Sequence, residues 1–143
     1  MSATATSNSV DPNRPLLETA RTQLAQGDLK AAAATLNQAQ KNNPHDARIF
    51  MLAGLMAEKA SNVAGAFEAL RHCVALAPDW GPGLLELALL LARQNQFKEA
   101  IETAEKVAAL EPKNLQVLAG VIDIAHRASH LEMAVRHLRR GLV

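Results

Sequence analysis

Apolar residues recur at helical spacing along the chain, and short polar breaks divide them into segments of about 14 residues. The breaks hold turn-forming pairs. Gly and Asn tolerate the left-handed backbone that ends a helix, and Asp or Ser caps the next one. These pairs are Gly27-Asp28, Ser61-Asn62, Asn95-Gln96 and Ser129-His130. The pattern predicts helices over residues 15–26, 29–42, 47–60, 63–76, 81–94, 97–110, 115–128 and 131–141.

The segments repeat with a period of 34 residues. Prolines keep this spacing at Pro44, Pro78 and Pro112. Alanines keep it at Ala32, Ala66, Ala100 and Ala134, and an apolar residue stands three places before each of them. The repeat units are residues 13–46, 47–80, 81–114 and a shortened 115–143. Residues 1–12 are small and polar, and we expect them to form a disordered N-terminal tail.

Composition agrees with an all-helical chain. Its 143 residues include 28 Ala and 21 Leu but no Tyr, which favours helix over strand. Apolar residues make up 49%, which excludes disorder for most of the chain. The formal net charge of +1 gives no field that would attract nucleic acid. The densest apolar run, Leu84–Ala92, is far shorter than the roughly 20 residues of a membrane span.

The period and its fixed positions resemble the tetratricopeptide repeat. Position 20 of each repeat unit is alanine, and the stretch Gln26–Ala32 is very similar to the turn of that family. Position 8 is small in three repeat units (Ala20, Gly54 and Ala88) but is Ile122 in the fourth. The resemblance implies an all-α fold, a right-handed α-solenoid of antiparallel helix pairs, with about four repeat units of which the last is incomplete.

The resemblance also implies a concave groove lined by the first helix of each repeat unit. Its expected peptide-binding residues form an apolar floor with a basic edge: Leu17, Arg21, Met51, Leu55, Lys59, Leu85, Leu89, Arg93 and Arg127. Such a surface suits an amphipathic helix or an extended apolar segment of a partner protein. A further domain of the same polypeptide covering these leucines is an open alternative. The carboxylate clamp of chaperone-binding relatives is broken, because Leu17 occupies its Lys position and Arg21 its Asn position.

The last predicted helix carries an uncapped apolar face that includes Val135, Leu138 and Leu142. Repeat arrays normally end in a helix with a polar outer face. Two interpretations therefore stay open: the natural chain continues beyond Val143, or the molecule forms a homodimer through this C-terminal helix.

No pattern of catalytic or metal-binding residues stands out. A single cysteine, Cys73, excludes an internal disulfide, and its small-residue position predicts a buried, inert thiol. His126 and His130 are four residues apart, but His130 falls in a predicted turn and no other ligand completes a site. We therefore expect no metal, no cofactor and no enzymatic activity.

The sequence predicts a protein-protein interaction scaffold that binds a protein or peptide in its groove, without a nucleic-acid partner or membrane insertion. Because no secretory signal is present, we expect a cytoplasmic protein. The alternative is the N-terminal repeat region of a larger enzyme, such as a bacterial glycosyltransferase or sulfotransferase. The length of the natural reading frame distinguishes the two.

Overall fold

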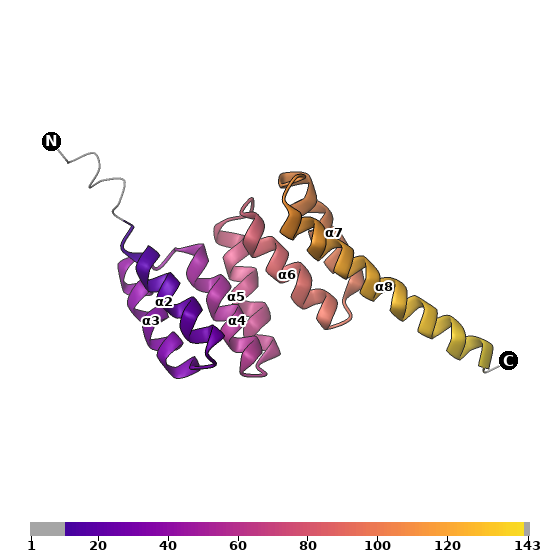
Figure 1. Ribbon diagram of the computed structural model, residues 1–143, viewed down its shortest axis with the longest axis horizontal. Coiled ribbons are helices and arrows are strands. Elements are labelled where there is room, and N and C mark those ends of the chain that lie inside the picture. The colour runs from indigo at the N-terminus through magenta and orange to yellow at the C-terminus, as the bar shows by residue number, and fades with distance from the viewer. Residues whose placement is uncertain (1–10, 142–143) are drawn as a thin grey trace. The chain divides into compact units, whose positions relative to one another are not determined.

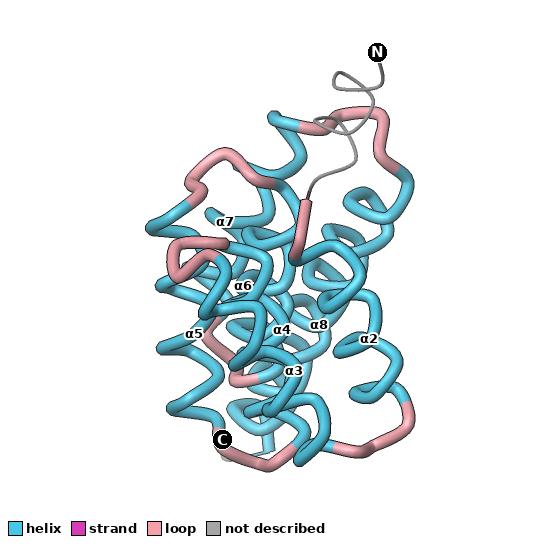
Figure 2. The backbone as a smooth tube through the Cα atoms, turned by 90° about the vertical axis from the view of Figure 1, so that its left-hand side faces the viewer, coloured by secondary structure: helices cyan, strands magenta, loops and turns pink. Residues whose placement is uncertain are grey.

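The computed structural model describes the backbone of residues 11–141 and the side chains of residues 11–130. Every regular element in this part of the chain is an α-helix (Figures 1 and 2). The helices are α2 (Asn13–Ala25), α3 (Leu29–Asn42), α4 (Ala47–Lys59), α5 (Val63–Leu76), α6 (Gly81–Arg93), α7 (Phe97–Leu110) and α8 (Leu115–Gly141). The predicted all-α helical repeat fold is confirmed, and the first six predicted helices match to within two residues.

The turns inside the helix pairs have the expected chemistry. The backbone is left-handed at Gly27 (φ 79°), Ser61 (φ 63°) and Asn95 (φ 63°). The next helix is then capped by a side chain in two of these turns. Asp28 Oδ1 accepts a hydrogen bond from the N–H of Ala31 at 3.1 Å, and Asn62 Oδ1 accepts one from Gly65 at 2.9 Å.

The chain divides into two compact halves, Met1–Leu76 and Ala77–Val143. In the N-terminal half, α2 pairs with α3 and α4 pairs with α5, and α4 also packs on α2 and α3. Two of the periodic alanines, Ala32 and Ala66, are fully buried where the paired helices approach each other. Leucines fill the remaining space, and Leu36, Leu52 and Leu70 are almost completely buried.

In the C-terminal half, α6 pairs with α7, and α8 packs on both. Ala88 and Ala100 are fully buried and repeat the close-contact positions of the N-terminal half. Leu90, Leu91 and Val107 complete this core. Within residues 11–141, no helix combines the length and the apolar content that crossing a bilayer requires.

The predicted turn at Ser129-His130 is wrong, because both residues lie inside the continuous helix α8. Each of the three observed turns has a residue that readily adopts positive φ (Gly27, Asn95) or a side chain that caps the following helix (Asp28, Asn62). In the pair Ser129-His130, Ser129 is neither Gly nor Asn, and His130 stands where Asp28 and Asn62 supply the capping side chain. The fourth repeat unit is therefore one long helix and not a pair.

Candidate functional site

The predicted groove residues of the N-terminal half come from α2 and α4, which pack on each other. Leu17 and Met51 are each only 6% exposed, because they lie in the core between the helices. Leu55 is half-buried, and Arg21 and Lys59 are exposed. The apolar surface left for a partner in this half is therefore centred on Leu55, and it is narrower than the sequence predicts.

In the C-terminal half, Leu85 and Leu89 of α6 are half-buried and Arg93 is exposed. Leu85 lies against α8 at Gly120, where a Cβ would stand 2.7 Å from Leu85 Cδ1. Arg127 of α8 is exposed, and its Nε contacts Asp123 Oδ2 at 3.1 Å. Leu85, Leu89 and Arg93 are spaced by four residues, so they follow one stripe of α6.

The predicted self-association residues lie at the end of α8. Val135 and Leu138 belong to its helical backbone, but their side chains are outside the described part of the structure. Leu142 lies outside the described residues altogether.

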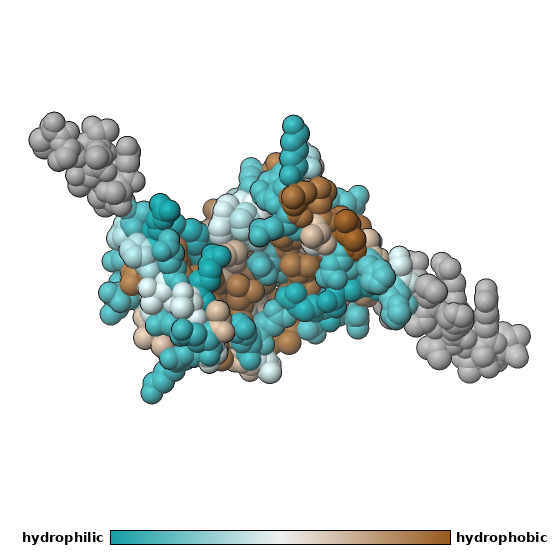
Figure 3. All heavy atoms as spheres, viewed as in Figure 1, coloured by the Kyte–Doolittle hydropathy of each residue, from teal (hydrophilic) through white to brown (hydrophobic). Residues whose placement is uncertain are grey.

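A second apolar surface on α8 was not predicted. Leu115 is 79% exposed and Ile122 is 68% exposed, and Leu118 beside them is also exposed. Figure 3 shows hydrophobic side chains gathered on the surface at the α7–α8 part of the chain. In the preceding repeat units, the small residues at position 8 (Ala20, Gly54 and Ala88) are buried in helix pairs. Because α8 does not turn back at Ser129, the corresponding face of the fourth repeat unit stays open.

A polar cluster joins the beginnings of α2 and α4. The guanidinium of Arg48 donates to both carboxylate oxygens of Asp46, at 2.9 Å from Nε and 2.8 Å from Nη2. It also donates to Asp11 at 2.8 Å from Nη1. The buried amide of Asn13 donates to Asp46 Oδ2 at 2.9 Å and accepts a hydrogen bond from Asn42. The cluster thus ties Asp11, two residues before α2, and Asn13, the first residue of α2, to the beginning of α4.

The electrostatics of this cluster favour the charged forms of Asp11, Asp46 and Arg48. Arg48 hydrogen bonds hold the pKa of Asp11 below its usual value. Burial alone would raise the pKa of Asp46, but hydrogen bonds from Arg48 and Asn13 outweigh it and lower that pKa. Both carboxylates in turn raise the pKa of Arg48. Because Arg48 is paired with Asp11 and Asp46 within the cluster, the cluster stabilises the fold and does not form a binding site for an anion.

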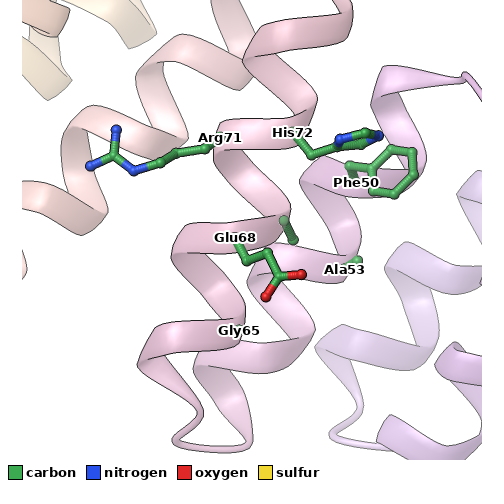
Figure 4. Close-up of a pocket in the computed structure, with 7 residues that line it drawn as sticks. Phe50, Ala53, Gly65, Glu68, Arg71 and His72 are labelled. Carbon is green, nitrogen blue, oxygen red and sulfur yellow. The ribbon is translucent and has the colours of Figure 1, made fainter.

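A pocket of about 820 Å³ lies on α4 and α5 in the N-terminal half. Its lining residues are Phe50, Ala53, Gly65, Glu68, Ala69, Arg71 and His72. Phe50 is the large apolar residue of this set, Ala53, Gly65 and Ala69 are small, and Glu68 and Arg71 are charged. The rings of Phe50 and His72 meet edge to face at 4.3 Å, and Figure 4 shows Arg71 pointing away from them. Sequence reasoning missed this pocket. Three of its lining residues, Ala53, Gly65 and Ala69, are small, but small residues also fill the helix contacts of the repeat and so gave no distinct signal.

No group of three or more His, Cys, Asp or Glu side chains able to hold a metal ion occurs among the described residues. His126 and His130 lie on one face of α8, with ring centroids 6.5 Å apart. Cys73 is buried, and burial raises the pKa of its thiol to about 11. This agrees with the predicted unreactive thiol, because the thiolate is the reactive form.

Sequence comparison identifies the family of the chain. Two models described as tetratricopeptide repeat match residues 17–79 and 82–114. The chain belongs to the tetratricopeptide repeat family. No curated protein matches its sequence.

Several solved structures share this fold, a tetratricopeptide repeat domain among them. The Thermobaculum terrenum O-GlcNAc transferase (K341M mutant) is 23% identical with a TM-score of 0.70 over 79% of this chain. The chain spans only 22% of the length of that transferase. The first tetratricopeptide repeat domain of Spaghetti (RPAP3), bound to an HSP90 peptide, is 18% identical with a TM-score of 0.70, covering 80% of this chain and 93% of that one. MamA is 20% identical with a TM-score of 0.65, covering 92% of this chain and 73% of that one.

Proposed function

We propose that this tetratricopeptide repeat chain is a non-enzymatic interaction module that binds a helix or an extended segment of a partner protein. The observation that carries the proposal is the stripe Leu85–Leu89–Arg93 on α6, where two half-buried leucines are followed by an exposed cation. On α4, the half-buried Leu55 is likewise followed four residues later by the exposed Lys59. Residues 13–143 form the repeat domain in this proposal.

The chemistry of the stripes defines the partner. Half-buried leucines gain from contact with apolar side chains, at roughly 25 cal/mol per Å² of apolar surface removed from water. The exposed Lys59 at the end of the α4 stripe favours a segment with an acidic residue beside its apolar ones. An amphipathic helix with an acidic edge meets both conditions. The peptide-bound RPAP3 domain is a precedent for such binding within this fold.

Capture of partner proteins from the native cell tests this function. We expect the variant Leu55→Glu/Leu89→Glu to lose the captured protein while keeping its helical circular dichroism, because each charge enters an apolar contact. Ile101→Glu on α7 is the matched control, since Ile101 is 38% exposed and lies outside both stripes. Equal capture by the double variant and the wild type would contradict binding at these stripes.

The second candidate is the N-terminal repeat region of a larger enzyme. The observation in its favour is that the matched transferase is much longer than this chain, which covers 22% of it. In that case the leucine stripes would serve substrate or domain docking in place of a free partner. Sequencing the natural reading frame distinguishes the candidates, because several hundred codons after Val143 would favour the enzyme.

A further inference from the structure

Two histidines stand one helical turn apart on the solvent-exposed side of α8. His126 and His130 are both exposed, and their ring centroids lie 6.5 Å apart with 27° between the ring planes. A turn at Ser129-His130 would separate these side chains, but His130 lies inside the continuous helix. The structure therefore brings together two imidazoles that the sequence pattern placed in a helix and in a turn.

This spacing suits a metal ion. Neutral imidazole is the commonest metal ligand among side chains, and two histidines at positions i and i+4 on one helix face can bind zinc together. An ion bound at about 2.1 Å by one nitrogen of each ring would hold the ring centroids roughly 5–6 Å apart. The observed separation is close to this range, so a small rotation of the two exposed side chains is enough to chelate an ion.

The surroundings of the pair supply no further protein ligand. Among the described residues, no group of three or more His, Cys, Asp or Glu side chains is placed to hold an ion. Asp123, one turn before Arg127, accepts a hydrogen bond at its Oδ2 from Arg127 Nε at 3.1 Å, so these two charges offset each other. Water must then complete the coordination shell. Two imidazoles with water favour an exchangeable divalent ion that prefers nitrogen ligands, such as Zn²⁺.

The pair spans the place where the earlier repeat units turn. The equivalent turns hold Gly27, Ser61 and Asn95, each with positive φ. An ion that bridges His126 and His130 needs both residues in one helical turn, about 6 Å apart along the axis. We propose that His126 and His130 form a two-ligand site for a divalent transition-metal ion, and that the bound ion holds α8 in its continuous form.

The coupling follows from which form of the helix binds the ion. Because only the continuous helix holds both imidazoles on one face, the ion stabilises that form over one that turns near residue 129. Leu118 and Ile122 are exposed while α8 is continuous. The bound ion therefore also keeps this apolar surface uncovered.

Titration calorimetry of Zn²⁺ into metal-free protein gives the first test. We expect one zinc ion per chain in the wild type. His126→Gln and His130→Gln should each lose this binding, because a single imidazole cannot chelate. His45→Gln is the matched control and should bind as the wild type does, since His45 is also exposed but lies before α4. Unchanged zinc binding in both single variants of the pair would overturn the proposal.

A displaced pair tests the geometry. His126→Gln/Ser129→His keeps two histidines in the same helix but places them on adjacent residues, about 100° apart around the axis. We expect this variant to bind zinc as weakly as His126→Gln does. Affinity equal to that of the wild type would show that the shared face is not needed and would overturn the site. One zinc ion per two chains, with a doubled mass in light scattering, would place the ion between molecules and would also overturn it.

Amide hydrogen exchange tests the effect of the ion on α8. At a zinc concentration ten times the dissociation constant, exchange at residues 129 and 130 should slow about tenfold, because opening the helix there must release the ion. His126→Gln should exchange at the same rate with and without zinc. Unchanged exchange in a wild type that binds zinc would overturn the role of the ion in holding α8 continuous.

Discussion

Gly54 of α4 lies directly against Leu70 of α5, so closely that a Cβ at Gly54 would stand 2.7 Å from Leu70 Cγ. Such a distance is far shorter than an ordinary carbon–carbon contact of about 3.5–4.0 Å. Leu70 is 1% exposed and has little room to move away. The absence of a side chain at Gly54 therefore sets how closely the two helices of this pair approach.

Replacing Gly54 by Val should lower the free energy of unfolding by about 1–3 kcal/mol, the usual cost of overpacking a core. Chemical denaturation followed by circular dichroism measures this change. Val has a higher helix propensity than Gly, so a loss of stability in Gly54→Val reports the overpacking. Ala64→Val, on the exposed side of α5, is the control that places a β-branched residue in the same helix pair without burying it. A loss no larger than in this control would show that α4 and α5 can separate without cost.

The Arg48 cluster predicts how stability depends on pH. The pKa of Asp46 is lowered in the folded protein, so its carboxylate contributes stability that is present above the unfolded value of 3.8 and is lost as pH falls through the folded pKa. Arg48→Leu removes the hydrogen bonds that lower this pKa. We expect a loss of about 1–3 kcal/mol at pH 7 and a weaker dependence on pH below 3.8.

Denaturation of this variant at pH 7 and at several values below pH 4 measures both effects. The control is Arg14→Leu, because Arg14 and Glu18 form an exposed ion pair at 3.6 Å, which contributes little to stability. If Arg48→Leu and Arg14→Leu gave the same stability and the same pH dependence, the cluster would have no role in holding α2 and α4.

The buried thiol of Cys73 should not react with a disulfide reagent in the folded protein. Its pKa of about 11 leaves almost no thiolate at pH 8, and its side chain is inaccessible. We expect complete reaction only after denaturation. Cys73→Ala should change the free energy of unfolding by no more than about 1 kcal/mol, because Ala39 fills the same repeat position in the preceding pair. Reaction at equal rates before and after denaturation would contradict burial.

The 34-residue period was enough to predict the helices and the turns within the first three pairs, because each repeated residue has a local physical role, and the resemblance to the tetratricopeptide repeat added how the pairs stack. Buried alanines such as Ala32 and Ala66 allow close helix contact, and turn pairs such as Gly27-Asp28 end one helix and begin the next. The binding surface was less predictable. Whether Leu17 is a groove residue or a core residue depends on how much of its side chain the neighbouring helices cover. The 34-residue period does not determine that covered fraction.

At residues 129 and 130 the 34-residue period predicts a turn, but the structure has a continuous helix there. His130 stands where Asp28 and Asn62 cap the following helix, and His is not among the residues that usually cap helices. Ile122 also disfavours a helix pair in this repeat unit, since it stands where the three earlier pairs have Ala or Gly. A bulky residue at that position opposes the close approach that a second helix would need.

Installing the turn chemistry of the first helix pair should therefore break α8. The variant Ser129→Gly/His130→Asp copies Gly27-Asp28, and Ile122→Ala restores the small contact residue. We expect the triple variant to end its helix near residue 128 and to pack residues 131–141 over Leu118. Amide hydrogen exchange should then become fast at residues 129 and 130, because those N–H groups lose their helical hydrogen bonds. The control Ser129→Ala/His130→Gln strengthens the helix and should keep exchange slow there. Unchanged exchange in the triple variant would mean that contacts other than the missing turn and the bulk of Ile122 keep α8 continuous.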